Sequence, residues 1–395
     1  LSLNRIKRLL KDLKNPEKKI TNAIQVVGTN GKFSVCSSLR EIFETAGYSV
    51  NMNISPSIRK FNERFYFYGK YISDEELYEL LIEVEKINKS QNITFHEFIC
   101  ACFFLAASRK KSDINILESG LFFRLDASNV LEQNIASVIT PIGIDHKNFL
   151  KSGTIDEIIY EKCSHLLNDS RIFIAQQKDD VLNKIKKIIY SNSSQKFIFD
   201  EDYSYNQNDN GFVYSDKMGK LNLPSPNLLG NFQLNNVSTA ISVARNLGQF
   251  KITEKDIKRA IIKIRSEGRL QIITKGKLKR YISKDNEILI DGAHNTLAAS
   301  AIKDFLKNFY NKKRIIMVLG MMANKEHKEF INIFKKKIYS IIAVDIPNQD
   351  NFVKKEKLMK IAKSCGIPST TEDSIEQAFK SASKQSSDAL IFCTG

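Results

Sequence analysis

The segment Gly28–Ser34 carries residue types that bind phosphate groups. Its two glycines let backbone N–H groups approach phosphate oxygens, and the following helix N-terminus favours an anion. Lys32 adds a positive charge, and Ser34 supplies a hydroxyl that suits Mg²⁺. The spacing is shorter than in the general phosphate-loop pattern. The pattern alone therefore leaves open both a phosphate site and a structural glycine turn.

Two further side chains have the chemistry of metal ligands. Glu118 ends the apolar stretch INILE, and His146 follows the stretch ASVIT, directly after Asp145. In open α/β sheets, ligands bind beyond the carboxyl ends of the strands, which is where both residues are expected. Together with Ser34 they form an oxygen and nitrogen set that suits Mg²⁺ or Mn²⁺ better than zinc. A lone histidine is more often a satisfied polar residue, so that alternative stays open.

The elements that must position these residues alternate between strand and helix. The apolar run in 20–27 predicts a strand before the glycine loop, and the helical spacing of 35–46 predicts a helix after it. This context is the one that a phosphate loop requires. Further expected strands are 48–55, 114–118 and 136–140, and further expected helices are 74–89 and 94–108. Such alternation predicts a mostly parallel sheet covered on both faces.

The second half of the chain predicts a small antiparallel insert and then a smaller α/β unit. Turn residues separate short strands over 196–226, helical spacing returns at 233–247, and RSEGRL at 265–270 is a candidate linker. Expected strands then lie around 287–291, 314–320, 340–346 and 389–395, with helices at 297–310, near 326–336 and at 353–364. The fold class is thus α/β, with an N-terminal domain over 1–265 and a Rossmann-like domain over 266–395. The first would be a phosphate-loop ATPase domain if the glycine loop binds phosphate.

Composition narrows the class of protein. The 395 residues include 26% charged residues, and no apolar run is long enough to span a bilayer. The net charge of +16 fits an anionic partner or a compositional bias towards lysine, and the scattered lysines favour bias over a nucleic-acid surface. Six cysteines without C-x-x-C spacing predict reduced, mostly buried thiols in a cytoplasmic protein.

Eight segments in order carry a resemblance to a known family. They are GTNGK, SPSIRKFNER, ESGLFFRLDASN, ITPIGIDH, EKCSHLL, LLGNFQLNN, GRLQ and LIDGAHN. Over about residues 20–395 the chain resembles the folylpolyglutamate synthase / dihydrofolate synthase family of the Mur ligase superfamily. The resemblance implies a monomeric, cytoplasmic ligase that uses ATP and Mg²⁺ to join L-glutamate to dihydropteroate, to a folate, or to both. It also implies an acyl-phosphate intermediate.

The resemblance also implies roles for individual residues. ATP contacts are expected at Gly28, Thr29, Asn30, Gly31, Lys32, Phe33, Ser34, Asn236, Arg269 and Asp291. Metal ligands are expected at Ser34, Ser55, Glu118, His146 and Lys162. The pteroate pocket is expected to include Thr94, Phe95, His96, Glu97, Leu125, Asp126 and Ala127. His294 is expected to face the phosphates and, with Lys32 and Lys162, to form the catalytic group. Family members carry the lysine at position 162 as a carbamate that holds a second Mg²⁺, whereas the residue alone predicts a solvated helix lysine.

Several positions depart from the family pattern. Phe33, Phe122 and Phe123 replace glycines, Phe232 replaces the histidine of G-x-H-Q, and Ser57 replaces the histidine of S-P-H. If these glycine positions need φ > 0, each phenylalanine is expected to add strain of about 1–3 kcal/mol. This motivates the alternative of an impaired nucleotide- or folate-binding remnant, and a third possibility is a Mur-type ligase for another carboxylate. Every expected metal- or charge-bearing residue is nevertheless present, which favours an active ligase.

Overall fold

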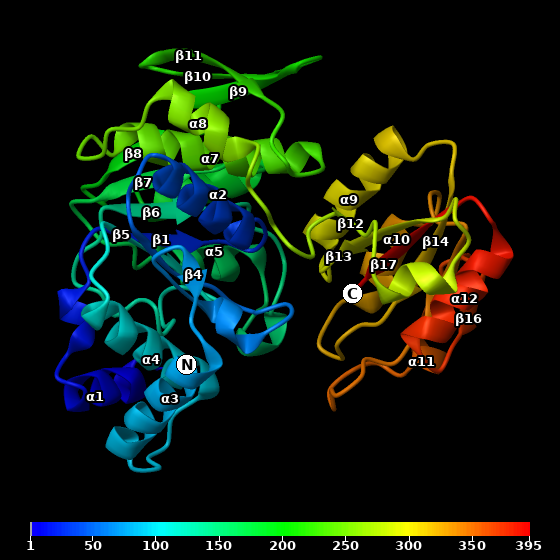
Figure 1. The fold of residues 1–395 in the computed structure, drawn as a ribbon, viewed down its shortest axis with the longest axis horizontal. Helices are drawn as coiled ribbons and strands as arrows, with labels where there is room; N and C mark the ends of the chain where they lie inside the picture. Colours follow the sequence, from blue (N-terminus) through cyan, green and yellow to red (C-terminus); the bar gives the residue numbers. More distant parts are fainter. Residues whose placement is uncertain (1) are drawn as a thin grey trace. The chain divides into compact units, whose positions relative to one another are not determined.

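The computed structural model describes residues 2–395, which form two compact units (Figure 1). The first unit comprises residues 1–142, 154–227 and 233–265, and the second comprises 143–153, 228–232 and 266–395. Two short segments that precede residue 266 in the chain thus belong to the second unit. One of these segments contains the candidate ligand His146.

An eight-stranded sheet forms the centre of the first unit, in the order β4-β3-β2-β5-β1-β6-β7-β8. Its strands are β1 (Ala23–Val27), β2 (Val50–Asn53), β3 (Phe65–Phe67), β4 (Lys70–Tyr71), β5 (Ile114–Glu118), β6 (Ala136–Ile139), β7 (Arg171–Ile174) and β8 (Gln195–Ile198). All neighbouring pairs are parallel except those made by β3, which pairs antiparallel with β2 and β4 at one edge. The central strands are buried along their whole length, as expected for a sheet covered on both faces.

Helices cover both faces of this sheet. They are α1 (Asn4–Asp12), α2 (Lys32–Thr45), α3 (Asp74–Asn88), α4 (Phe95–Arg109), α5 (Ile155–Cys163), α6 (Asp179–Ile188), α7 (Asn231–Asn246) and α8 (Glu254–Ile261). On one face α1, α3 and α4 pack together, and the apolar helix α4 lies between the other two and the sheet. Its predicted burial is confirmed, because seven consecutive residues from Ile99 to Leu105 are at most 7% exposed.

The predicted antiparallel insert is present but smaller than expected. It consists of β9 (Tyr203–Asn208), β10 (Gly211–Asp216) and β11 (Gly219–Pro224), which form a separate three-stranded sheet (Figure 1). The beginning of the expected insert was assigned wrongly. Residues 195–198 form β8, which pairs in parallel with β7 and extends the large sheet.

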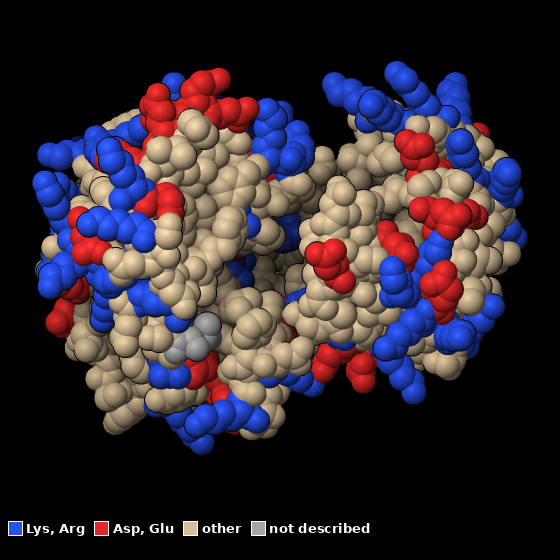
Figure 2. Space-filling view, turned by 90° about the horizontal axis from the view of Figure 1, so that it is seen from below, with Lys and Arg blue, Asp and Glu red and all other residues tan. Residues whose placement is uncertain are grey.

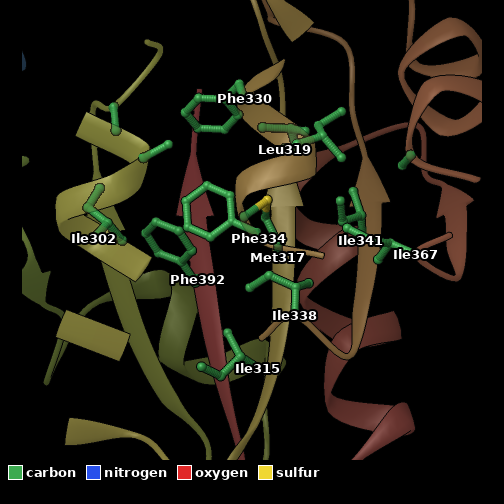
Figure 3. Packing of buried hydrophobic residues seen from close by; sticks show 14 of the residues in the cluster. Ile302, Ile315, Met317, Leu319, Phe330, Phe334, Ile338, Ile341, Ile367 and Phe392 are labelled. Atoms are coloured by element: carbon green, nitrogen blue, oxygen red, sulfur yellow. The ribbon is translucent and has the colours of Figure 1, made fainter. Parts of the chain in front are cut away.

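The second unit contains a six-stranded sheet in the order β12-β13-β17-β14-β15-β16. Its elements are β12 (Gln271–Ile272), β13 (Glu287–Asp291), α9 (Thr296–Phe309), β14 (Arg314–Leu319), α10 (His327–Ile333), β15 (Ser340–Ala343), α11 (Lys355–Ser364), β16 (Ser369–Thr371), α12 (Ile375–Gln385) and β17 (Ala389–Thr394). Only β12 is antiparallel. Phe334 and Phe392 meet in the apolar core between this sheet and helices α9–α11 (Figure 3). The predicted α/β class with a mostly parallel sheet is confirmed.

On one face of the molecule, basic side chains are scattered over both units, as a compositional bias predicts. Figure 2 shows lysines and arginines distributed over this face of both units, with acidic residues between them.

Within the described residues, no helix combines the length and the hydropathy that a membrane crossing requires.

Candidate active site

The phosphate loop begins where β1 ends, and backbone geometry and close contacts explain why it contains two glycines. Gly28 has φ +150°, and a Cβ there would lie 2.0 Å from Thr140 Oγ1. Gly31, the N-cap of α2, has φ +86°, and its Cβ would lie 2.4 Å from Asn236 Oδ1. Both positions therefore require glycine. The second contact also brings the predicted ATP ligand Asn236 against the loop.

Hydrogen bonds to the neighbouring strand end fix the rest of the loop. The N–H groups of Thr29 and Asn30 donate to the carbonyl of Pro141, at 3.0 and 3.2 Å. Lys32 folds over the loop and donates to the carbonyls of Gly28 and Thr29, at 3.2 and 3.3 Å. The loop is thus an ordered turn at a helix N-terminus, with one lysine ammonium directly above it.

Parallel register places the acidic candidate at the same sheet edge. Val26 of β1 is aligned with Glu118 at the end of β5, and Asn53 at the end of β2 is aligned with Leu117. Glu118 is 4% exposed and accepts a hydrogen bond from the N–H of Ser55 at 3.1 Å. Carboxylate and hydroxyl oxygens at this edge fit a hard cation such as Mg²⁺.

The pKa of the Cys36 thiol responds to the charges of both Glu118 and Lys32. Its pKa is raised well above the ordinary value by burial and then by the charge of Glu118, while Lys32 lowers it. The phosphate-loop lysine and the strand-end carboxylate therefore share one neighbourhood. The thiol itself is fully buried, which argues against a nucleophilic role.

Lys162 is not the solvated lysine that its helix position alone predicts. It is 3% exposed, and its ammonium donates to the carbonyls of Gly28 at 2.8 Å and Leu121 at 2.7 Å. The side chain thus links the first residue of the phosphate loop to the segment after Glu118. A carbamate on this nitrogen would put anionic oxygens where carbonyl oxygens already face it, so these surroundings do not fit that group.

The substituted phenylalanines do not carry the expected backbone strain, and that expectation is wrong. Phe33, Phe122, Phe123 and Phe232 all have negative φ. Phe33 lies in the first turn of α2, and Phe122 and Phe123 are buried. Phe232 packs against the apolar core of the second unit. Positions 33, 122 and 123 therefore do not require glycine in this chain, although the three rings fill space that glycine would leave open.

The expected acceptor pocket divides into residues that face one another and residues that stabilise a helix. His96 Nε2 lies 3.4 Å from Asp126 Oδ2, and Asp126 is 7% exposed. The nearby Cys100 sulfur and Asp126 hold the pKa of His96 above its ordinary value, against the effect of burial. Phe95 is 62% exposed. Leu125 is half-buried and Ala127 is buried in the turn that carries Asp126.

Thr94 and Glu97 have a different arrangement. They form a capping box at the start of α4, in which each side chain bonds the other's backbone N–H. Glu97 also accepts a hydrogen bond from Arg5 of α1 at 2.9 Å. Their observed contacts are those of a helix N-terminus tied to α1.

A second cluster of charged residues lies within the second unit. Asp145 Oδ2 lies 3.2 Å from His294 Nε2 and accepts a hydrogen bond from Asn295 at 3.0 Å, while Lys325 donates to Oδ1 at 2.7 Å. These residues line a cavity of about 230 Å³ together with His146. Burial opposes ionisation of Asp145, but the His294 hydrogen bond and the charges of His146, His294 and Lys325 hold its pKa well below the usual range.

Sequence reasoning missed Lys325 and gave Asp145 no role of its own. Both follow the carboxyl ends of parallel strands, β14 and β6 respectively, so position relative to the strands was a usable signal. Nearby, Asp291 accepts a hydrogen bond from the N–H of Leu270 at 2.8 Å. Burial raises the pKa of Asp291, an effect that Arg269 partly offsets. The predicted pair of Arg269 and Asp291 thus lies together.

The metal candidates are divided between the two units. Ser34, Ser55, Glu118 and Lys162 belong to the first unit, and His146 belongs to the second. Within residues 2–395, no group of three or more His, Cys, Asp or Glu side chains has a metal-binding arrangement. Mg²⁺ usually keeps water or substrate oxygens among its ligands, so a site at Ser34, Ser55 and Glu118 does not require such a group.

Two family models match most of the chain. Residues 26–244 match the Mur ligase middle domain, and residues 268–395 match the Mur ligase glutamate ligase domain. The chain is 30% identical over 344 residues to the dihydrofolate synthase/folylpolyglutamate synthase of Bacillus subtilis, covering 83% of this chain and 77% of that protein. It is 26% identical to the folylpolyglutamate synthase of Lacticaseibacillus casei, covering 87% and 81%.

Solved structures show the same fold. The E. coli FolC complex with ADP has a TM-score of 0.88 at 23% identity, covering all of this chain and 91% of that one. The Yersinia pestis bifunctional folylpolyglutamate synthase/dihydrofolate synthase complexed with AMPPNP and Mn ion has a TM-score of 0.87 at 22% identity, covering 100% and 90%. The chain therefore belongs to the dihydrofolate synthase / folylpolyglutamate synthase family of Mur ligases.

Proposed function

We propose that this chain uses ATP to join L-glutamate to dihydropteroate, to a (tetrahydro)folate, or to both. The observation that supports this most strongly is the ordered phosphate loop, with Asn236 against it and Glu118 at the same sheet edge. The acceptor carboxylate would attack the γ-phosphate, releasing ADP and forming an acyl phosphate. The glutamate amine would then attack the activated carbonyl, and inorganic phosphate would leave.

The residues of this chain have separate roles in the proposal. Residues 28–34 and Asn236 would hold the nucleotide phosphates, with Arg269 and Asp291 as further ATP contacts. Ser34, Ser55, Glu118 and His146 would provide metal ligands, and bound Mg²⁺ would offset the phosphate charge. His96, Asp126 and exposed Phe95 would line the acceptor pocket. His294 would face the transferring phosphoryl group, with its ring oriented by Asp145.

The proposal also includes a monomeric protein in the cytoplasm, acting on small molecules. All six cysteines are free thiols, as is typical of a reducing compartment. We also propose that the boundary near residue 265 separates an ATP-binding part from a glutamate-ligase part.

Nothing in the comparisons supports an impaired remnant. The negative φ angles at the phenylalanines also remove the strain argument for it. Membership in this family likewise argues against a ligase for an unrelated carboxylate.

The proposal is tested by measuring phosphate release with ATP, Mg²⁺ and glutamate, with dihydropteroate and tetrahydrofolate supplied separately. At least one acceptor should stimulate release above the rate without acceptor. Lys32→Ala should abolish turnover, because the loop loses its positive charge. Lys220→Ala, on the exposed side of β11, is the matched control and should retain activity. No acceptor-dependent release by the unmodified protein would refute the proposal.

A further inference from the structure

Lys162 lies in surroundings that select for a cation. Its nitrogen donates to the carbonyls of Gly28 and Leu121, and it lies 5.3 Å from the centroid of the Phe122 ring. Carbonyl oxygens and the face of an aromatic ring both present negative potential. The side chain is also almost completely buried, so bulk water does not screen these interactions.

The segment that provides this environment is fixed to the same helix. The N–H groups of Phe123 and Arg124 both donate to the carbonyl of Glu161, at 3.0 and 2.8 Å. The Glu161 carboxylate pairs with the Arg124 guanidinium through three contacts of 2.7 to 3.0 Å. The Leu121 carbonyl and the Phe122 ring are therefore held near Lys162 by the backbone of α5.

A carbamate would reverse the sign of the charge at this position. It forms when an uncharged amine takes up CO₂ and releases a proton, and it adds a planar anionic group to the nitrogen. Its oxygens would lie among carbonyl oxygens and near the negative face of Phe122, where like charges repel. A glycine at position 122 would offer open space in place of this ring. The phenylalanine at position 122 and the carbonyl contacts of Lys162 thus both disfavour a carbamate.

We propose that Lys162 of this chain remains an unmodified ammonium ion that acts as a fixed positive charge at the start of the phosphate loop. Lys32 and Lys162 both donate to the carbonyl of Gly28, so their ammonium groups lie close together at this residue. A carbamate with a bound Mg²⁺ carries a net charge of +1, which equals the charge of one ammonium. Lys162 therefore supplies the same net charge without CO₂ or a second metal ion.

The covalent state of Lys162 can be measured without any assay of turnover. The protein is incubated with ¹³C-bicarbonate, carbamate carboxyls are trapped by O-alkylation, and peptides are analysed by mass spectrometry. Exposed lysines, which form carbamates at high bicarbonate, are the internal positive control. We expect trapped label on these lysines and none on Lys162. Label on Lys162 at low bicarbonate would overturn the inference.

A second measurement tests the charge, and it rests on the proposed function for its readout. Lys162→Arg keeps a cation but cannot form a carbamate, whereas Lys162→Met keeps only the bulk. If the ammonium acts as a charge, the arginine variant should exceed the methionine variant in kcat/KM by about tenfold or more. Equal loss in both, together with recovery of Lys162→Ala by added formate or acetate, would contradict the inference.

Phe122 variants separate the effects of space and charge. Phe122→Leu fills the same volume without an aromatic face, and Phe122→Gly opens the space. Wild type and Phe122→Leu should show no bicarbonate dependence of turnover; a bicarbonate-dependent wild type would count against the inference. If the wild type also shows no turnover, the proposed function fails, while the trapping experiment still decides the covalent state of Lys162.

Discussion

Gly31 shows most directly how one residue determines the shape of the nucleotide site. Its positive φ turns the chain into α2, and the absence of a side chain lets Asn236 approach the loop. Most L-residues adopt this backbone conformation only with strain. The same position therefore combines a conformational requirement with a contact that a side chain would block.

We expect Gly31→Ala to reduce kcat/KM for ATP by at least about 100-fold, because the new methyl group displaces Asn236 and reshapes the loop. Gly47→Ala is the matched control. Gly47 also has positive φ, at +92°, but a Cβ there meets nothing within 4 Å. Both variants should lose stability in denaturant unfolding through the positive φ, Gly31→Ala the more because of its clash, and only Gly31→Ala should lose ATP affinity. Equal kinetic losses in both would contradict this explanation.

Asp145 is a second residue whose substitution should disturb other side chains of the site. We expect Asp145→Asn to lower kcat/KM by about 10–100-fold, because His294 and Lys325 lose the carboxylate that orients them. Asp216→Asn removes a comparably buried carboxylate at the end of β10, which is paired with Arg245 of α7. This control should lower the midpoint of denaturant unfolding without changing kcat/KM. An Asp145→Asn protein with wild-type kinetics would remove the positioning role.

At the level of residues, sequence reasoning was most informative where a motif was local. The glycine loop and Glu118 lie at one sheet edge of the first unit, and Arg269 lies near Asp291 in the second, while their binding roles stay predictions. Lys325 escaped because its loop carries no motif and its partner lies far away in the chain. The strain expected at Phe33 and Phe122 was wrong because backbone φ depends on the loop path, which a substitution alone does not reveal.

Glu97 stabilises the start of helix α4, whereas the resemblance implies a place for it in the acceptor pocket. Glu97 was expected in the acceptor pocket, yet its carboxylate caps α4 and pairs with Arg5. Burial raises the pKa of Glu97, but Arg5 and the Thr94 hydrogen bonds more than compensate, so the net pKa lies below its ordinary 4.5. The ionised form is therefore the one that the folded state favours.

We expect Glu97→Gln to destabilise the protein by about 1 kcal/mol at pH 7, because it weakens the cap. A folded-state pKa below the unfolded value contributes stability that is present above pH 4.5 and is lost as the pH falls through the folded-state pKa. The difference between wild type and variant should therefore shrink in acid. Urea unfolding at pH 7 and below pH 4 measures this. An unchanged stability with a raised KM for the acceptor would instead support a substrate contact.

The elements themselves were predictable where their periodicity was strong. The strands around β1, β5 and β6 and the buried helix α4 follow from apolar runs bounded by turn residues. Strand β8 was assigned to the insert because KFIF precedes a turn-rich segment, and only its parallel pairing with β7 separates it. Local pattern shows that a strand forms, whereas its partner depends on the whole sheet.

At the scale of the molecule, the chain is not divided between the two compact units at a single position. Residues 143–153 belong to the second unit, although most of the preceding chain builds the first. All six strands β12–β17 lie within residues 266–395. The core of the second unit should therefore be separable from the segment that carries Asp145.

We expect a fragment of residues 266–395 to fold cooperatively, because it retains the sheet and its apolar core. Without Asp145, its His294 and Lys325 should lose their fixed arrangement. Far-UV circular dichroism with thermal unfolding tests the first point, and NMR line shapes of the His294 ring test the second. A peptide of residues 143–153 offers a control by adding back the missing segment. A fragment with no cooperative transition would show that the segment is needed for folding.

The same division has a consequence for synthesis on the ribosome. Asp145 and its partner His294 are 149 residues apart in the chain. The strands of the first sheet are all complete by residue 198, while residues 143–153 must wait for partners that have not yet been made. During translation this segment therefore exposes Asp145 before its partners His294, Asn295 and Lys325 exist. A stop codon or proteolytic cut before residue 266 would leave it permanently in that state.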